Sequence, residues 1–202
     1  MKLHDSAMAP NPRRVRIFLS EKGIEVPTVQ VDLGKAENRQ PPFLSLNPLG
    51  GVPILELDDG SVIAESVAIC RYFEEAQPEP ALLGTGAAGR ANVEMWQRRT
   101  ELVLFNNVTG CFRNTHDFFK GRIPQVAEYG AVCKEAAIKS LDFFDDRLKD
   151  GEFLAGDAYT IADITALVAL DFGRISEIRI GAEHKHLTRW YETVSNRPSA
   201  KA

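Results

Sequence analysis

Along residues 1–76, short runs of β-forming residues alternate with helical patterns of apolar positions. Strands are predicted near 2–4, 26–31, 53–57 and 61–64, and helices near 15–23, 43–46 and 65–76. The helical segment between the first two strands makes them parallel, whereas the tight turn Asp58-Asp59-Gly60 makes the last two antiparallel. The pattern therefore predicts a β-α-β-α-β-β-α unit.

After this unit the pattern changes to helices alone. Residues 77–89 are rich in proline and glycine and show little periodicity, which is typical of a linker. Helices are predicted over 90–119 (with Gly110 as a candidate kink), 126–148, 164–175 and 186–194. Thr160 and Asp163 have the spacing of a capping box before the third of these helices. We therefore predict an α/β domain at 1–78 and an all-helical domain at 88–202.

Composition adds limits on location and partners. The 202 residues are 44% hydrophobic and 26% charged, and the net charge of −4 gives no electrostatic reason to expect nucleic acid or an anionic membrane as partner. No apolar run approaches membrane-spanning length, and no secretory signal pattern opens the chain. The three cysteines, Cys70, Cys111 and Cys133, have neither zinc-site spacing nor a CxxC pair. We expect a cytoplasmic protein without a bound metal, and Cys70 as a buried core thiol.

The segment from Val52 to Ser66 carries the clearest chemical signal. Pro53 opens a β-rich run that a central ladder would not tolerate, so it marks a sheet edge, a strand start or a cis turn. A helix must begin at Glu65-Ser66, where its first N–H groups have no partners within the helix. A proline-positioned strand beside a hydroxyl-bearing helix N-terminus suits an anion and a peptide backbone.

In order and spacing, these segments resemble the glutathione S-transferase family. Asn47-Pro48 precedes Val52-Pro53, Glu65-Ser66 follows, and the stretch from Phe153 to Asp163 fits the family's second domain. The resemblance, to cytosolic bacterial-type members, covers nearly the whole chain. It implies a thioredoxin-like N-terminal domain followed by an all-helical C-terminal domain, with glutathione as co-substrate, a small hydrophobic electrophile and a homodimer.

The resemblance also implies a set of glutathione contacts. A residue before a cis proline exposes its N–H and C=O to a peptide ligand, which is the role expected of Val52. Ser66 would hold one carboxylate through its hydroxyl and N–H, with Glu65 as an acceptor, although an ordinary helix cap is the alternative for Ser66. The loop before Phe43 is where the family binds the glycyl carboxylate. The predicted contacts are Asn38, Arg39, Val52, Pro53, Glu65 and Ser66.

The residue that activates the thiol is harder to assign. The family carries a Tyr, Ser, Cys or Asn in the first strand-to-helix turn, and this donor stabilises the thiolate. Here the usual Ser or Cys position falls near Ala9, which has no donor. Asn11 resembles the amide donor of some bacterial classes and is our candidate, with Ser6 as the alternative.

Three functions compete at this point. The first is a transferase that conjugates glutathione to small apolar electrophiles, and the second is a non-catalytic binding or regulatory protein that retains the fold. The third is a glutathione-dependent thiol-disulfide or peroxide reductase. In the first case, the electrophile pocket is expected between the two domains, with Met8, Phe105, Cys111, Phe112, His116 and Phe119 as candidates to line it.

Overall fold

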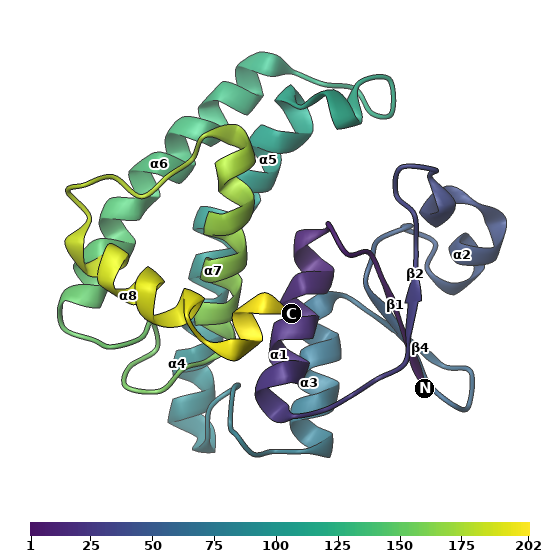
Figure 1. The fold of residues 1–202 in the computed structure, drawn as a ribbon, viewed down its shortest axis with the longest axis horizontal. Coiled ribbons are helices and arrows are strands. Elements are labelled where there is room, and N and C mark those ends of the chain that lie inside the picture. The colour runs from purple at the N-terminus through teal and green to yellow at the C-terminus, as the bar shows by residue number, and fades with distance from the viewer. The chain divides into compact units, whose positions relative to one another are not determined.

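The protein is described by a computed structural model that covers residues 1–202 and divides into two compact units (Figure 1). Unit 1 comprises Met1–Leu82 together with Pro198–Ala202, and unit 2 comprises Leu83–Arg197. Unit 1 mixes strands and helices, whereas unit 2 contains helices only apart from one isolated bridge. The predicted fold class is therefore confirmed.

Unit 1 is built on a four-stranded sheet (Figure 1). Its elements are β1 (Lys2–Asp5), α1 (Pro10–Lys22), β2 (Thr28–Gln30), the 3-10 turn η1 (Glu37–Arg39), α2 (Pro41–Leu46), β3 (Ile54–Glu56), β4 (Val62–Ala64), α3 (Ser66–Ala76) and the 3-10 turn η5 (Pro198–Lys201). The strand order is β2-β1-β3-β4, with β1 parallel to β2 and antiparallel to β3, and β3 antiparallel to β4. This arrangement confirms the predicted connectivity.

Strand register assigns the two faces of the sheet to different helices. Leu3 pairs with Leu55, and both side chains are buried on the face covered by α1 and α3 (Figure 1). His4 pairs with Ile54 on the opposite face, where Phe43 of α2 packs. The His4 ring meets the Phe43 ring edge-on, with 6.1 Å between their centroids. The sheet thus lies between α2 and the α1–α3 pair.

Helix α1 begins earlier than predicted. Pro10 and Pro12 occupy its first turn, where a missing N–H costs no helical hydrogen bond and the fixed φ favours the helix. The helix ends as predicted at Gly23, whose left-handed φ of 64° lets its N–H bond to the carbonyls of Leu19 and Ser20.

The last residues of the chain belong to unit 1, although the sequence pattern groups them with the helical part. The guanidinium of Arg13 donates to the carbonyl of Ala200 at 2.9 Å. The hydroxyl of Ser199, which is buried, donates to the carboxylate of Glu21. Both partners lie on α1, so η5 packs along this helix.

Unit 2 is a bundle of helices. They are α4 (Gly86–Arg99), the π-helical segment η2 (Thr100–Phe105), α5 (Asn106–Thr115), the 3-10 turn η3 (Asp117–Phe119), α6 (Ala127–Lys149), α7 (Ile161–Gly173), the 3-10 turn η4 (Arg174–Ser176) and α8 (Lys185–Ser195). The first three follow one another without a break where one long helix was predicted. Helices α6, α7 and α8 begin and end within three residues of their predicted limits.

The irregularity of the long helix lies at η2, and a kink at Gly110 stays a prediction. Helix α5 continues through Gly110. A Cβ at this position would lie 2.8 Å from the Sγ of Cys133 on α6. The glycine therefore permits the close approach of α5 and α6.

Helix α7 forms the centre of unit 2, with nearly every residue buried. Its N-terminus carries the predicted capping box, in which the Thr160 side chain accepts from the backbone of Asp163 and the carboxylate of Asp163 accepts from the Thr160 N–H at 3.0 Å. The same carboxylate accepts from the Leu154 N–H at 3.0 Å and from the Trp190 Nε1–H at 2.8 Å. Burial raises the pKa of Asp163, while these donors act in the opposite direction.

Candidate active site

Three segments that are distant in sequence meet at one edge of the sheet of unit 1. Strand β3 is antiparallel to both β1 and β4, so the residues after β1, before β3 and after β4 lie at the same edge. These residues are Ser6, Val52–Pro53 and Glu65–Ser66. The register thus brings together four of the predicted glutathione contacts and the alternative thiol donor.

The Val52–Pro53 peptide bond is cis, which confirms this prediction. The first paired residue of β3 is Ile54, so the N–H and C=O of Val52 stand outside the ladder of the sheet. Pro53 is buried, whereas Val52 is only partly covered. The backbone of Val52 can therefore serve an extended peptide as donor and acceptor.

Asn38 and Arg39 hold the loop that precedes Val52. The Nδ2 of Asn38 donates to the carbonyl of Gly50 at 2.7 Å, and the Nη1 of Arg39 donates to the carbonyl of Leu49 at 3.2 Å. Gly50 has a φ of 64°, and a Cβ there would come within 2.8 Å of the Asn38 carbonyl oxygen. Both side chains thus position this loop, and their contact with a glycyl carboxylate stays a prediction.

The start of α3 combines a strained residue with a buried hydroxyl. Glu65 is exposed and has a φ of 71°, in a region that L side chains rarely adopt. No side chain caps this N-terminus. Ser66 is the first helical residue and is only 5% exposed. Unpaired N–H groups and the positive end of the helix dipole make this terminus suitable for a carboxylate.

A buried arginine joins the start of α1 to the start of α3. The guanidinium of Arg14 is 1% exposed, and its Nη1 donates to the Oγ of Ser66 at 2.7 Å. The same nitrogen donates to the Oδ1 of Asn11 at 3.2 Å. The structure therefore links the candidate thiol donor Asn11 to the candidate carboxylate ligand Ser66 through one positive charge.

The turn between β1 and α1 is held by a second arginine. Asp5 is buried at the end of β1, and one of its oxygens accepts from Arg16 Nη1 at 2.6 Å. The other oxygen accepts from Gln30 Nε2 at 2.7 Å, and Arg16 Nη2 donates to the Ala7 carbonyl at 3.0 Å. Ser6 is buried at the start of this turn. The turn that carries Ser6 and leads into the start of α1, where Asn11 lies, is thus fixed from two sides.

The sequence analysis did not place Arg14 in the site. Its position on the apolar face of α1 was the available signal, since Ile17 and Phe18 follow it at helical spacing and both are fully buried. An arginine on such a face needs buried polar partners. Ser66 lies 52 positions away in the sequence, so local pattern alone could not identify that partner.

The three cysteines all lie in the interior of the protein. Cys70, Cys111 and Cys133 are all free and buried, which confirms the prediction for Cys70. Burial raises the pKa of the Cys70 thiol to about 12. Its thiolate is therefore negligible at neutral pH.

Unit 2 holds an aromatic cluster around Phe112 of α5. Its ring lies 4.4 Å from the His116 ring, 5.7 Å from the Phe119 ring and 4.8 Å from the Phe172 ring, measured between centroids. Phe112 and Phe119 are partly exposed, and His116 is exposed. Phe105 and Cys111, two other pocket candidates, are buried in unit 2, and Met8 of unit 1 is 91% exposed.

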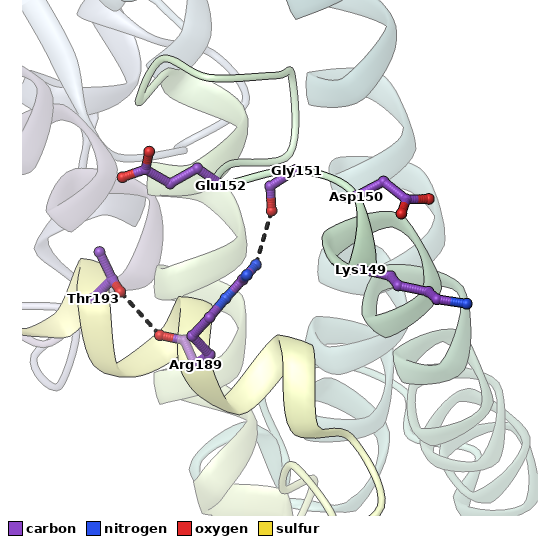
Figure 2. Close-up of a pocket in the computed structure, with 6 residues that line it drawn as sticks. All are labelled: Lys149, Asp150, Gly151, Glu152, Arg189 and Thr193. Atoms are coloured by element: carbon purple, nitrogen blue, oxygen red, sulfur yellow. Dashed lines mark hydrogen bonds between the residues drawn. The ribbon is translucent and has the colours of Figure 1, made fainter.

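A polar cleft of about 540 Å³ lies elsewhere in unit 2 (Figure 2). It is lined by Lys149, Asp150, Gly151, Glu152, Arg189 and Thr193. Figure 2 shows the Arg189 guanidinium directed at the carbonyl of Gly151. Arg189 also donates to the Leu148 carbonyl at 2.7 Å, so it completes the C-terminal end of α6. None of the predicted site residues lines this cleft.

The fold contains neither a metal-binding cluster nor a membrane-spanning helix. No group of three or more His, Cys, Asp or Glu side chains is arranged to hold a metal ion. None of the helices has the length and apolar character needed to cross a membrane.

Comparison with known proteins identifies the family. Residues 9–76 match the glutathione S-transferase N-terminal domain, and residues 105–198 match the C-terminal domain. Glutathione S-transferase 2 of Saccharomyces cerevisiae is 35% identical over 208 aligned residues, which cover 100% of this chain and 88% of the relative.

Two solved structures superpose on this chain along nearly their whole length. Gtt2 of Saccharomyces cerevisiae superposes with a TM-score of 0.95 at 34% identity, covering 100% of this chain and 99% of that one. A glutathione S-transferase domain-containing protein of Marinobacter aquaeolei VT8 gives 0.94 at 38% identity, covering 98% and 99%. The chain therefore belongs to the glutathione S-transferase family and is a glutathione transferase.

Proposed function

We propose that unit 1 binds glutathione at the sheet edge formed by Ser6, Val52–Pro53 and Glu65–Ser66, and that the bound thiol attacks small apolar electrophiles. The observation that carries this proposal is the strand register, which brings the free backbone groups of Val52 alongside the uncapped N-terminus of α3. An extended tripeptide needs both features, because it has backbone amides and a carboxylate at one end.

In this arrangement each group has a defined role. Val52 pairs with a peptide amide of glutathione through its backbone. Ser66 donates its hydroxyl and N–H to the γ-glutamyl carboxylate, and Glu65 accepts from the α-ammonium group. Asn38 and Arg39 lie beside loop 47–51, where the glycyl carboxylate is proposed to bind.

Calorimetric titration with glutathione tests the binding site. Ser66→Ala should weaken binding by at least about tenfold, because a hydrogen bond to a charged group contributes roughly 1.5–3 kcal/mol and each 1.4 kcal/mol is about a factor of ten. Ser20→Ala, an exposed helical serine of α1, is the matched control and should bind like the wild type. Wild-type protein that shows neither heat nor a shift in Tm at millimolar glutathione would contradict the proposal.

Thiol activation is assigned to Asn11, with Ser6 as the alternative. Because Oδ1 of Asn11 faces the Arg14 guanidinium, the amide N–H₂ is the part left to donate to a thiolate. Ultraviolet titration of the glutathione complex should show a higher thiol pKa in Asn11→Ala, together with lower kcat and little change in affinity. If Ser6 is the donor, only Ser6→Ala should show this pattern.

The same titration separates the competing functions. A non-catalytic binding protein should show no thiolate absorbance near neutral pH and no turnover in the wild type or either variant. A reductase should turn over disulfide or peroxide substrates but not aryl or alkyl electrophiles. A panel of both substrate kinds, measured at saturating glutathione, therefore decides between conjugation and reduction.

We further propose a small apolar electrophile as the second substrate. The substrate panel at saturating glutathione tests this proposal, and turnover of disulfides or peroxides alone would contradict it.

A homodimer is proposed from exposed apolar side chains on unit 2. Met95 of α4, Leu102 of η2 and Phe143 of α6 are each 39–50% exposed. The Phe143 ring stacks on Trp96, with 5.6 Å between their centroids, and this contact fixes the orientation of the exposed ring. Sedimentation velocity should show a dimer for the wild type and dissociation for Leu102→Glu.

A cytoplasmic location is also proposed for this protein. Its three cysteines are free, which suits a reducing compartment.

A further inference from the structure

Three arginines follow one another closely on α1, and only one of them is buried beneath the proposed site. Arg13 donates to the carbonyl of Ala200, and Arg16 pairs with Asp5 under the β1–α1 turn. Arg14 lies between them and is 1% exposed, with Ser66 and Asn11 as partners of the same guanidinium nitrogen. Its charge therefore stands next to the residues proposed for carboxylate binding and for thiol activation.

The chemistry of arginine fixes how these two partners are oriented. A guanidinium has donors only, so the Asn11 atom that faces it must be the carbonyl Oδ1, and the N–H₂ group points the other way. The Oγ of Ser66 likewise accepts from Arg14, which leaves the hydroxyl proton for another acceptor. A positive charge on the accepting oxygen also makes that hydroxyl a stronger donor.

We propose that Arg14 is a positioning residue that couples carboxylate binding at Ser66 to thiol activation at Asn11. This inference rests on the proposed glutathione site. The guanidinium presets the donor direction of both side chains before glutathione binds, and its charge lowers the free energy of the carboxylate and of the thiolate together. Loss of Arg14 therefore disturbs two functions, one at the γ-glutamyl carboxylate and one at the cysteinyl thiol of the ligand.

A double-mutant cycle on glutathione affinity tests this coupling. Ser66→Ala should weaken binding about tenfold in the wild type, but less than about threefold in Arg14→Lys, because the lysine ammonium ends one bond short of the position of Arg14 Nη1, the nitrogen that donates to both Ser66 and Asn11. Ultraviolet titration should show a higher pKa for the bound thiol in Arg14→Lys. Arg13→Lys is the matched control, and it should leave both the affinity and the thiol pKa unchanged.

If Arg14→Lys does not fold, as judged by circular dichroism, the Asn11→Ala and Ser66→Ala pair gives the answer. Their effects on the thiol pKa should be non-additive, because both act through the same guanidinium. Additive effects, or a thiol pKa in Arg14→Lys equal to that of the wild type, would overturn the inference. A wild type that does not bind glutathione at all would instead overturn the proposed function on which it rests.

Discussion

The N-termini of α3 and α7 differ in whether a side chain of the protein accepts hydrogen bonds from their N–H groups. Each N-terminus carries a buried hydroxyl residue, which is Ser66 as the first helical residue of α3 and Thr160 as the N-cap of α7. At α7, the Asp163 carboxylate satisfies backbone donors of the terminus and two groups beyond it. At α3 there is no side-chain cap, and the preceding residue, Glu65, has a strained backbone. A terminus completed by its own chain supports the fold, whereas an incomplete terminus is available to a ligand.

The largest effect is expected where the completed terminus is broken. Asp163→Ala leaves the N–H groups of Leu154, Thr160 and Trp190 buried without their acceptor, so the free energy of unfolding should fall by about 4 kcal/mol. Urea unfolding monitored by circular dichroism measures this loss. Asp157→Ala, at an exposed position, should stay within about 0.5 kcal/mol of the wild type.

A second pair of substitutions compares two buried hydroxyls of unit 2, one with a hydrogen-bond partner and one without. The Thr165 hydroxyl donates to the Oε1 of Gln97 at 2.8 Å, so Thr165→Val should lower the free energy of unfolding by about 1–3 kcal/mol. The Thr100 hydroxyl is buried without a hydrogen-bond partner, and Thr100→Val should be neutral or stabilising. Equal losses in thermal melts of the two variants would contradict this distinction.

Relief of backbone strain at Glu65, before the uncapped N-terminus of α3, should raise the free energy of unfolding and weaken glutathione binding. Glu65→Gly removes the cost of a φ of 71° and should raise the free energy of unfolding by about 1 kcal/mol, while glutathione binding weakens. Glu177→Gly relieves a φ of 58° in unit 2 and is the matched control, with unchanged affinity. If Glu65→Gly binds glutathione as tightly as the wild type, the strained backbone of Glu65 does not serve glutathione binding.

The smallest expected effect is the pH-dependent contribution of Glu56, on β3, to the stability of the fold. Hydrogen bonds from His4 and Lys2 hold the pKa of Glu56 below its usual value near 4.5. A lowered folded-state pKa contributes stability above the unfolded-state value, and this contribution is lost as pH falls through the folded-state value. The small Tm difference between wild type and Glu56→Gln should therefore disappear under acidic conditions. A Tm difference that persists below the folded-state pKa would assign it to packing.

Local patterns were sufficient for features set by neighbouring residues. The cis bond at Pro53, the helix start at Ser66 and the capping box at Thr160 each follow from residues within a few positions of one another. Arg14 and the loop contacts of Asn38 could not be predicted, because their partners are chosen by how strands and helices pack. The π-helical segment at 100–105 also has no signature in the apolar pattern. The roles in glutathione chemistry remain predictions for the experiments above.

The burial of the cysteines has a consequence for the lifetime of the enzyme. With a pKa of about 12, Cys70 is a thiolate in only about one molecule in 10⁵ at pH 7. Cys111 and Cys133 are likewise shielded by the packing of α5 and α6. Electrophiles that reach this protein therefore meet no nucleophilic sulfur of its own at the surface. Electrophiles can alkylate these cysteines only when the packing of the helices opens, so the buried thiols are protected for as long as the fold is intact.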